Sequence, residues 1–107
     1  MKKFLFIFIF YAISSVTIPT AFAKSGLVPK YSLTSYCRKI SNVSGGSYQI
    51  EEVCREQERT AYADIASKNI PNRIWNYCDR IGIISGGSFQ LFDVCVEQET
   101  GSMGRVR

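Results

Sequence analysis

One segment of this chain occurs twice. The first copy opens with Tyr36-Cys37, passes through Ser44-Gly45-Gly46-Ser47 and closes with Cys54-Arg55-Glu56-Gln57-Glu58. The second copy opens with Tyr77-Cys78, passes through Ser85-Gly86-Gly87-Ser88 and closes with Cys95-Val96-Glu97-Gln98-Glu99. Most of the chain therefore consists of two copies of one unit. A single small domain made of two such units needs a core that they share.

The apolar residues of each copy follow a helical period. They recur in steps of three and one, on both sides of the Ser-Gly-Gly-Ser break, which is the spacing of one face of an α-helix rather than of a strand. In the first copy they are Leu33, Tyr36, Cys37, Ile40 and Val43 before the break, and Ile50, Val53, Cys54, Gln57 and Ala61 after it. Each copy is predicted to be two amphipathic helices joined by a tight turn.

The break itself has the residues of a helix end followed by a helix start. One glycine of each pair, Gly45-Gly46 or Gly86-Gly87, can adopt the left-handed conformation that ends a helix. Ser47 and Ser88 can then cap the next helix.

The four cysteines are placed symmetrically about these turns. Cys37 and Cys54 are equally far from the first Gly-Gly pair, and Cys78 and Cys95 from the second. With a rise of about 1.5 Å per residue, each pair meets at the same height on two antiparallel helices. The predicted disulfides are thus Cys37–Cys54 and Cys78–Cys95, each stabilising a small domain by about 3 kcal/mol. Without histidine or a C-x-x-C pair, the sequence predicts no metal site and no cofactor.

The predicted fold class is all-α, with two tandem disulfide-stapled antiparallel helical hairpins forming a small four-helix domain. The expected boundaries are a signal peptide at 1–23, a flexible N-terminus at 24–30, hairpins at 31–69 and 70–100, and a disordered tail at 101–107.

The segment 1–23 has the pattern of a secretory signal peptide. Lys2 and Lys3 precede the apolar run Phe4 to Ile13, and Ala21-Phe22-Ala23 has the small residues of a cleavage site. Loss of Lys2 and Lys3 lowers the net charge from +4 to +2. We expect an exported protein, periplasmic or secreted, with paired cysteines, no membrane span after cleavage and no nucleic-acid partner.

The repeated motif resembles that of small exported bacterial proteins, largely uncharacterised, with a Tyr-Cys … Gly-Gly-Ser-Tyr … Cys … Gln-Glu helical hairpin in one or two copies. The resemblance covers about residues 33–100, with Phe89 where the motif usually has Tyr. It implies an exported helical-hairpin fold and brings no established activity.

Three substitutions make the second copy more apolar than the first. Asn42, Glu51 and Arg55 in the first copy become Ile83, Phe92 and Val96 in the second. Phe92 and Val96 are one helical turn apart and form an additional apolar stripe. One interpretation is that this stripe packs against the long helix of the first copy, near Tyr62 and Ile65. The other is that Ile83, Phe92 and Val96 form a surface patch that binds a partner.

A polar group ends each copy: Gln57 and Glu58 in the first, Gln98 and Glu99 in the second. Counting back through the turn places Glu58 opposite about residue 33 and Glu99 opposite about residue 74. They could satisfy the free N–H groups at those helix starts, or line a polar pocket at the open end of each hairpin. No carboxylate pair converges in both copies, so no enzyme is predicted.

The sequence thus predicts an exported, non-enzymatic binding or inhibitory module for another envelope or secreted protein. The alternative is a secreted, membrane-active, peptide-like factor, for which a net charge of +2 gives little support. The oligomeric state is left open.

Overall fold

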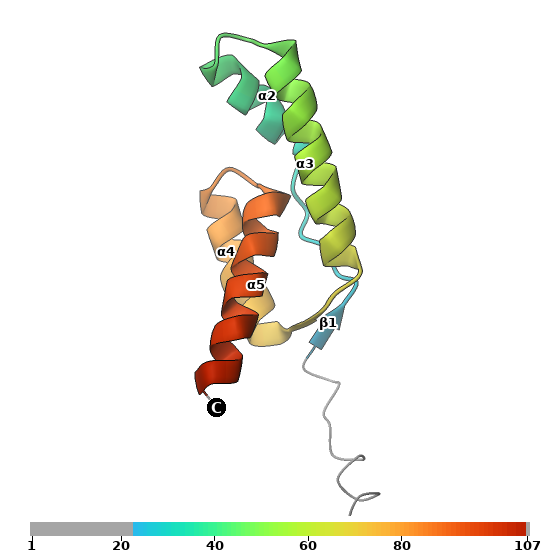
Figure 1. Ribbon diagram of the computed structural model, residues 1–107, viewed down its shortest axis with the longest axis vertical. Helices are drawn as coiled ribbons and strands as arrows, with labels where there is room; N and C mark the ends of the chain where they lie inside the picture. The colour runs from blue at the N-terminus through green and yellow to red at the C-terminus, as the bar shows by residue number, and fades with distance from the viewer. Residues whose placement is uncertain (1–22, 107) are drawn as a thin grey trace, which may run out of the picture.

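The computed structural model describes residues 23–106, so the predicted signal peptide falls almost wholly outside the described residues. Four helices carry the fold, and two short strands form a small ribbon (Figure 1). In chain order the elements are β1 (Ala23–Ser25), α2 (Leu33–Val43), α3 (Tyr48–Ala66), β2 (Asn69–Pro71), α4 (Asn72–Ile84) and α5 (Phe89–Val106). The predicted all-α fold of two helical hairpins is confirmed.

Both hairpin turns use the predicted residues. All four glycines, Gly45, Gly46, Gly86 and Gly87, have positive φ angles, although the sequence predicts this of only one in each pair. The Gly46 N–H donates to Ser41 O and the Gly87 N–H to Gly82 O, both at 2.8 Å, which closes the first helix of each hairpin.

Serine caps begin the second helix of each hairpin. The hydroxyl of Ser47 accepts from Ile50 N at 3.3 Å, and that of Ser88 accepts from Leu91 N at 3.2 Å. Each hydroxyl satisfies one of the N–H groups that a helix start leaves free.

The two disulfides are those predicted. Cys37 is bonded to Cys54 and Cys78 to Cys95, and the Cα atoms of each pair are 5.6 Å apart. These bonds are compatible with an exported protein. Among the described residues, no helix is both long enough and apolar enough to cross a membrane.

The core lies where the second half of α3 packs against α5, and the two hairpins contribute to it unequally (Figure 1). Helix α2 packs mainly against α3, and its buried residues are Cys37 and Ser41. The apolar core cluster is formed instead by Ala61, Ile65, Ile70, Ile74, Cys78, Phe89, Phe92, Cys95 and Val96.

The prediction of a flexible N-terminus at 24–30 is wrong. Strand β1 pairs antiparallel with β2, and the indole N–H of Trp75 donates to Leu27 O at 3.0 Å. Next along the chain, the Tyr31 ring lies against Gly82, where an added Cβ would be 2.8 Å from the ring carbon Cζ. These contacts hold the segment along the second hairpin. Local sequence gave no sign of the strand pairing or of the Trp75 hydrogen bond, because the partners lie far along the chain.

The prediction of a disordered tail at 101–107 is also wrong for residues 101–106, and Arg107 lies outside the described residues. Helix α5 continues through Gly101 and Gly104 as far as Val106, and Met103 packs against the core. Two glycines in a helix reduce its intrinsic stability, which is why the sequence suggested an end there. As a result, α5 is almost as long as α3.

Candidate functional site

Glu58 is a buried carboxylate at the junction of the two hairpins. Its side chain is 2 % exposed, and it accepts hydrogen bonds from the Ser88 hydroxyl at 2.6 Å, from Phe89 N at 2.6 Å and from Gln90 N at 3.1 Å. With Ser88 taking the N–H of Leu91, the first three N–H groups of α5 are satisfied. The interpretation that Glu58 accepts from free N–H groups at a helix start is correct. The helix is α5, however, not the start of its own hairpin near residue 33.

The other members of the predicted polar group are not brought together. Gln57 and Gln98 are exposed, and Glu99 is half-buried on α5. Unlike Glu58, the carboxylate of Glu99 has no hydrogen-bond or ion-pair partner among the described residues. Glu99 therefore does not cap a helix near residue 74.

The predicted partner patch does not form. Phe92 and Val96 are 0 % and 3 % exposed and belong to the core, where Phe92 packs edge-on against Trp75 with ring centroids 5.6 Å apart. Ile83 is 59 % exposed and is not part of the core cluster. The interpretation that this stripe packs between the repeats holds for Phe92 and Val96, and the patch interpretation is wrong for both.

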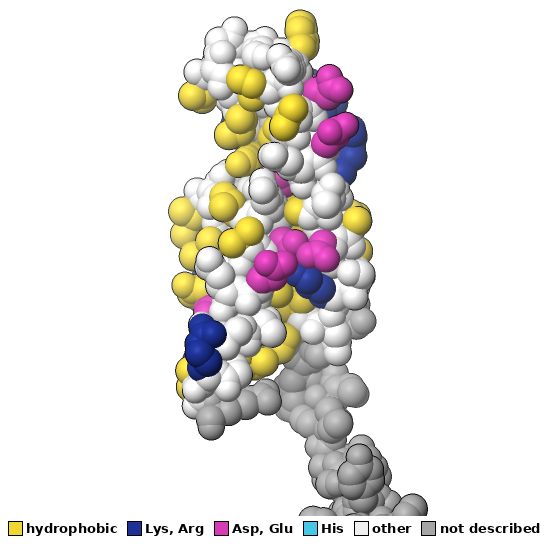
Figure 2. Space-filling view, viewed as in Figure 1, with side chains coloured by type: hydrophobic (Ala, Val, Ile, Leu, Met, Phe, Trp, Pro, Cys, Tyr) yellow, Lys and Arg dark blue, Asp and Glu magenta, His cyan; other side chains and the backbone are white. Residues whose placement is uncertain are grey.

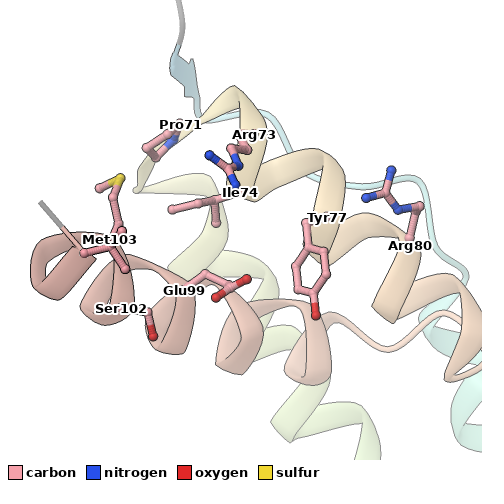
Figure 3. Close-up of a pocket in the computed structure, with 9 residues that line it drawn as sticks. Pro71, Arg73, Ile74, Tyr77, Arg80, Glu99, Ser102 and Met103 are labelled. Atoms are coloured by element: carbon pink, nitrogen blue, oxygen red, sulfur yellow. The ribbon is translucent and has the colours of Figure 1, made fainter.

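A groove of about 650 Å³ runs between α4 and the C-terminal half of α5 (Figure 3). Pro71, Ile74, Met103 and Val106 make it largely apolar, and Tyr77, Arg73, Arg80, Ser102 and Glu99 add its polar groups. Glu99 projects from α5 into the space between the two helices. Neither guanidinium has an ion-pair partner among residues 23–106, so the groove presents uncommitted charges of both signs beside apolar surface.

An exposed apolar face recurs in both hairpins. Ile50, Val53, Tyr77, Leu91 and Val94 are each 38 to 48 % exposed, and they pair by repeat position as Ile50 with Leu91 and Val53 with Val94. Figure 2 shows apolar side chains spread over both hairpins along one side of the molecule. On the first hairpin they line a hollow of about 350 Å³ that reaches Gln90 of the second. The apolar positions that the two copies share thus lie partly outside the core.

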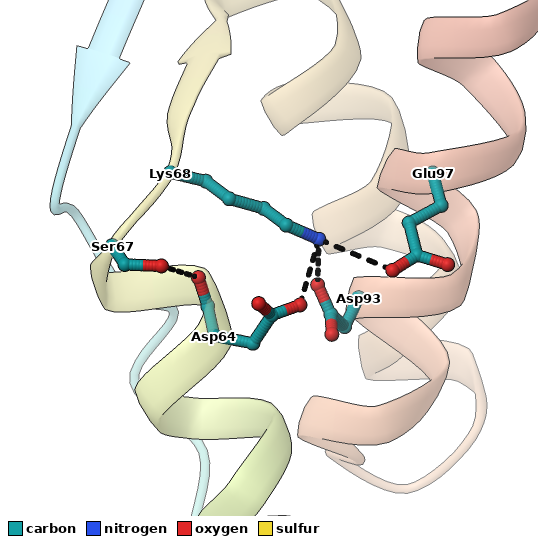
Figure 4. Close-up of polar contacts among 5 residues, drawn as sticks. All are labelled: Asp64, Ser67, Lys68, Asp93 and Glu97. Carbon is teal, nitrogen blue, oxygen red and sulfur yellow. Dashed lines mark hydrogen bonds and ion pairs between the residues drawn. The ribbon is translucent and has the colours of Figure 1, made fainter.

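A lysine and three carboxylates form the polar part of the contact between α3 and α5 (Figure 4). The ammonium group of Lys68 lies 2.9 Å from Asp64, 2.6 Å from Asp93 and 3.5 Å from Glu97. Burial disfavours its charge, but the hydrogen bonds to Asp64 and Asp93 outweigh this and raise the pKa of Lys68.

The two aspartates of this cluster titrate differently. Burial, followed by a hydrogen bond to Asp64, raises the pKa of Asp93 to about 6. The same hydrogen bond, with the help of Lys68, lowers the pKa of Asp64. The carboxylate oxygens of Asp64, Asp93 and Glu97 lie within 4.8 Å of one another, as metal ligands could, but the Lys68 ammonium already supplies the positive charge among them.

Sequence reasoning missed three groups of residues. Tyr31 falls at the edge of the predicted first hairpin, but its hydroxyl donates to Asp79 Oδ1 at 2.8 Å and its ring packs against Phe89, with centroids 5.2 Å apart. Lys68 carries no signal beyond its place at a helix end, and Arg73 and Arg80 belong to no motif. One signal was available for Tyr31, since Gly82 stands where the first copy has Ser41.

No protein-family model matches this chain, and the comparisons with curated proteins and with solved structures give no match either.

Proposed function

We propose that this protein is an exported, non-enzymatic module that binds another envelope or secreted protein through the face that its two hairpins share. The observation that carries the proposal is the matched exposure of Ile50 with Leu91 and of Val53 with Val94. The two copies share the buried positions of Cys37 with Cys78 and of Ser41 with Gly82. The core residues Phe92 and Val96, however, replace Glu51 and Arg55 of the first copy, so burial in the core does not explain why Ile50 with Leu91 and Val53 with Val94 are apolar in both.

The hollow on the first hairpin supports this proposal. Tyr36, Ile40, Ile50 and Val53 line it beside the amide groups of Gln49 and Gln57, so an apolar floor has polar groups at its edge. Protein interfaces commonly have this composition. Because Ile40, Ile50 and Val53 in this floor are each 38 to 48 % exposed, a partner could bury the floor without unfolding the chain.

The proposal of a non-enzymatic role is supported by the hydrogen bonds of Glu58, the buried carboxylate between the hairpins. Both oxygens of the Glu58 carboxylate accept hydrogen bonds at the start of α5. A carboxylate held in this way is structural, since using it as a base would take the acceptor from the N–H groups of Phe89 and Gln90.

Site-specific photo-crosslinking in the native envelope tests the proposal. A photoreactive residue replaces Val53 in one variant and Val94 in another, and the same residue replaces Arg59, which is exposed on a different side of α3, in the matched control. Both test positions should give the same crosslinked partner protein, identified by mass spectrometry, and position 59 should not. Crosslinking to no protein at either position, or equally at position 59, would refute the proposal.

A membrane-active factor is the alternative, favoured by the tip of the first hairpin. There Val43 and Tyr48 are each 88 % exposed, as residues that enter a bilayer would be. The acidic residues Glu51 and Glu52 follow directly on α3 and oppose insertion into an anionic membrane. Leakage of dye from anionic liposomes on addition of the oxidised protein would favour this alternative, and Tyr48→Asp should then abolish the leakage.

A further inference from the structure

The contact between the two hairpins joins unlike parts of the repeated unit. The first copy contributes the C-terminal half of its second helix, α3, where Glu58, Ala61 and Ile65 are buried. The second copy supplies its turn and the start of α5, with Ser88 and Phe89. The ring of Phe89 packs against Tyr62 of α3, with centroids 5.2 Å apart. The hairpins are therefore joined head to tail.

Each half of this contact has an unused equivalent elsewhere in the chain. The α3 side of the contact, which we call the acceptor side, consists of Glu58, Ala61, Tyr62 and Ile65. In the repeat alignment these residues correspond to Glu99, Ser102, Met103 and Val106. The four corresponding residues line the groove between α4 and α5. Figure 3 shows Glu99, Ser102 and Met103 along this stretch of α5. The extension of α5 to Val106 thus repeats the part of α3 that holds the second hairpin, but no segment of the described chain lies on it.

The start of α5, which is the inserted side of the contact, has its equivalent at the other end of the molecule. Ser88, Phe89 and Gln90 correspond to Ser47, Tyr48 and Gln49 at the start of α3. Tyr48 is 88 % exposed where Phe89 is 3 % exposed. Among the described residues, the N–H groups of Tyr48 and Gln49 have no acceptor, whereas those of Phe89 and Gln90 bond to Glu58. Figure 1 places the start of α3 and the end of α5 at opposite ends of the fold.

We propose that the groove between α4 and α5 of one molecule receives the start of α3 from a second copy of this chain. Glu99 then accepts from the N–H groups of Tyr48 and Gln49 as Glu58 does from those of Phe89 and Gln90. Tyr48 enters beside Met103, which gives a favourable sulfur–aromatic contact. The carboxylate without a partner and the two N–H groups that the Ser47 cap leaves free then satisfy each other.

The charges at the edges of the two surfaces are complementary. The repeat alignment carries Asp64 onto Arg105 and Asp93 back onto Glu52. Within the chain, carboxylate oxygens of Asp64 and Asp93 lie within 4.8 Å of each other and share Lys68. In the contact between copies, this pair becomes Arg105 facing Glu52, which attract each other directly.

The contact between copies should be weaker than the contact within the chain. Phe92 and Val96, which fill the core, correspond to Glu51 and Arg55 in the incoming copy. Tyr31 and Gly82, which pack together, correspond to Asn72 and Ser41. The contact therefore depends on Glu99, Tyr48 and the charged edge, and it forms a reversible association.

A head-to-tail contact of this kind is heterologous, so it does not end at a dimer. Each added molecule leaves one groove and one α3 start free, and assemblies grow with concentration. The inference goes beyond the proposed function and does not depend on it, because a monomer could still bind another protein through the face that the hairpins share.

The test is sedimentation velocity of the purified, oxidised protein from about 10 µM to 1 mM, a range that covers weak association. The weight-average mass of the natural protein should rise beyond that of a dimer. Glu99→Lys blocks the groove and Tyr48→Asp blocks the α3 start, so each should raise the dissociation constant about tenfold or more. Arg38→Glu, an exposed charge change on α2, is the control and should associate as the natural protein does.

Mixing the two blocked variants gives the decisive result. Glu99→Lys keeps its α3 start and Tyr48→Asp keeps its groove, so an equimolar mixture should form a 1:1 dimer that grows no further. Circular dichroism of each variant confirms that it is folded. A natural protein that stays monomeric at about 1 mM, a symmetric dimer that both variants retain, or a mixture that forms no dimer would each overturn the proposal.

Discussion

Glu58 and Glu99 occupy the same place in the two copies and follow the same Glu-Gln pair, yet only Glu58 is buried. The difference comes from what lies beside each helix. The start of α5 lies against Glu58 and presents two backbone N–H groups to it, whereas Glu99 faces an open groove. Burial of the first carboxylate is tolerated because its oxygens are satisfied by hydrogen bonds.

Replacement of Glu58 by alanine should lower the free energy of unfolding by about 2–4 kcal/mol, since the buried Phe89 N and the partly buried Gln90 N would lose their acceptor. The matched control is Glu99→Ala, which should change it by no more than about 0.5 kcal/mol in dilute solution. Urea unfolding followed by circular dichroism measures both. Equal losses in the two variants would contradict the structural role assigned to Glu58.

The packing of α3 against α5 combines the apolar core with a charged cluster, and this makes the contact sensitive to pH. Lys68 follows the end of α3, Asp64 lies in its last turn, and Asp93 and Glu97 come from α5 (Figure 4). The pKa of Asp93 is raised from 3.8 to about 6. Since the folded state binds this proton more tightly than the unfolded chain, the stability from this group is complete below about pH 3.8 and is lost as the pH rises through about 6.

Asp93→Asn should remove this loss, because asparagine keeps a hydrogen-bond donor for Asp64 and carries no charge. Relative to the natural protein, the variant should gain about 1–2 kcal/mol in unfolding free energy between about pH 4 and pH 7, after allowance for solvent screening. Urea unfolding at a series of pH values measures the difference. A difference that is constant with pH would show that Asp93 titrates normally in the folded protein.

The two hairpins differ in how they are supported in the complete molecule. The second shares a core with α3, the ribbon and the N-terminal segment, whereas α2 of the first buries Cys37 and Ser41 and packs mainly against α3. The two disulfides therefore stabilise different parts. Cys37–Cys54 holds α2 in place, and Cys78–Cys95 lies in the core.

Replacing both cysteines of a bridge by serine should show this difference. Loss of Cys37–Cys54 should abolish protection from hydrogen exchange in residues 33–43 while α4 and α5 remain protected. Loss of Cys78–Cys95 should lower the stability of the whole fold by about 3 kcal/mol. If α2 kept its protection without its bridge, contacts other than the disulfide would have to hold it.

Much of the fold could be predicted because it depends on local signals. Helical periodicity, the Gly-Gly turns and the Ser47 and Ser88 caps act within a few residues, and the symmetric cysteines follow from helix geometry. The predicted site was less successful. Phe92 and Val96 were recognised as unusual, but their burial depended on where α3 packs. The N-terminal segment escaped prediction because Tyr31 and Leu27 are bound by Asp79 and Trp75, far along the chain.

The sequence by itself determined two disulfide-linked helical hairpins, since each copy contains every residue that its own turn, caps and bridge require. The tertiary structure decided how the copies are joined and which of two equivalent groups is used. Nearly identical local sequences cannot specify that Glu58 is covered and Glu99 open, or that Phe89 is inserted and Tyr48 exposed. That choice follows from the order of the copies along one chain, which places the second beside the end of the first and leaves the outer ends free.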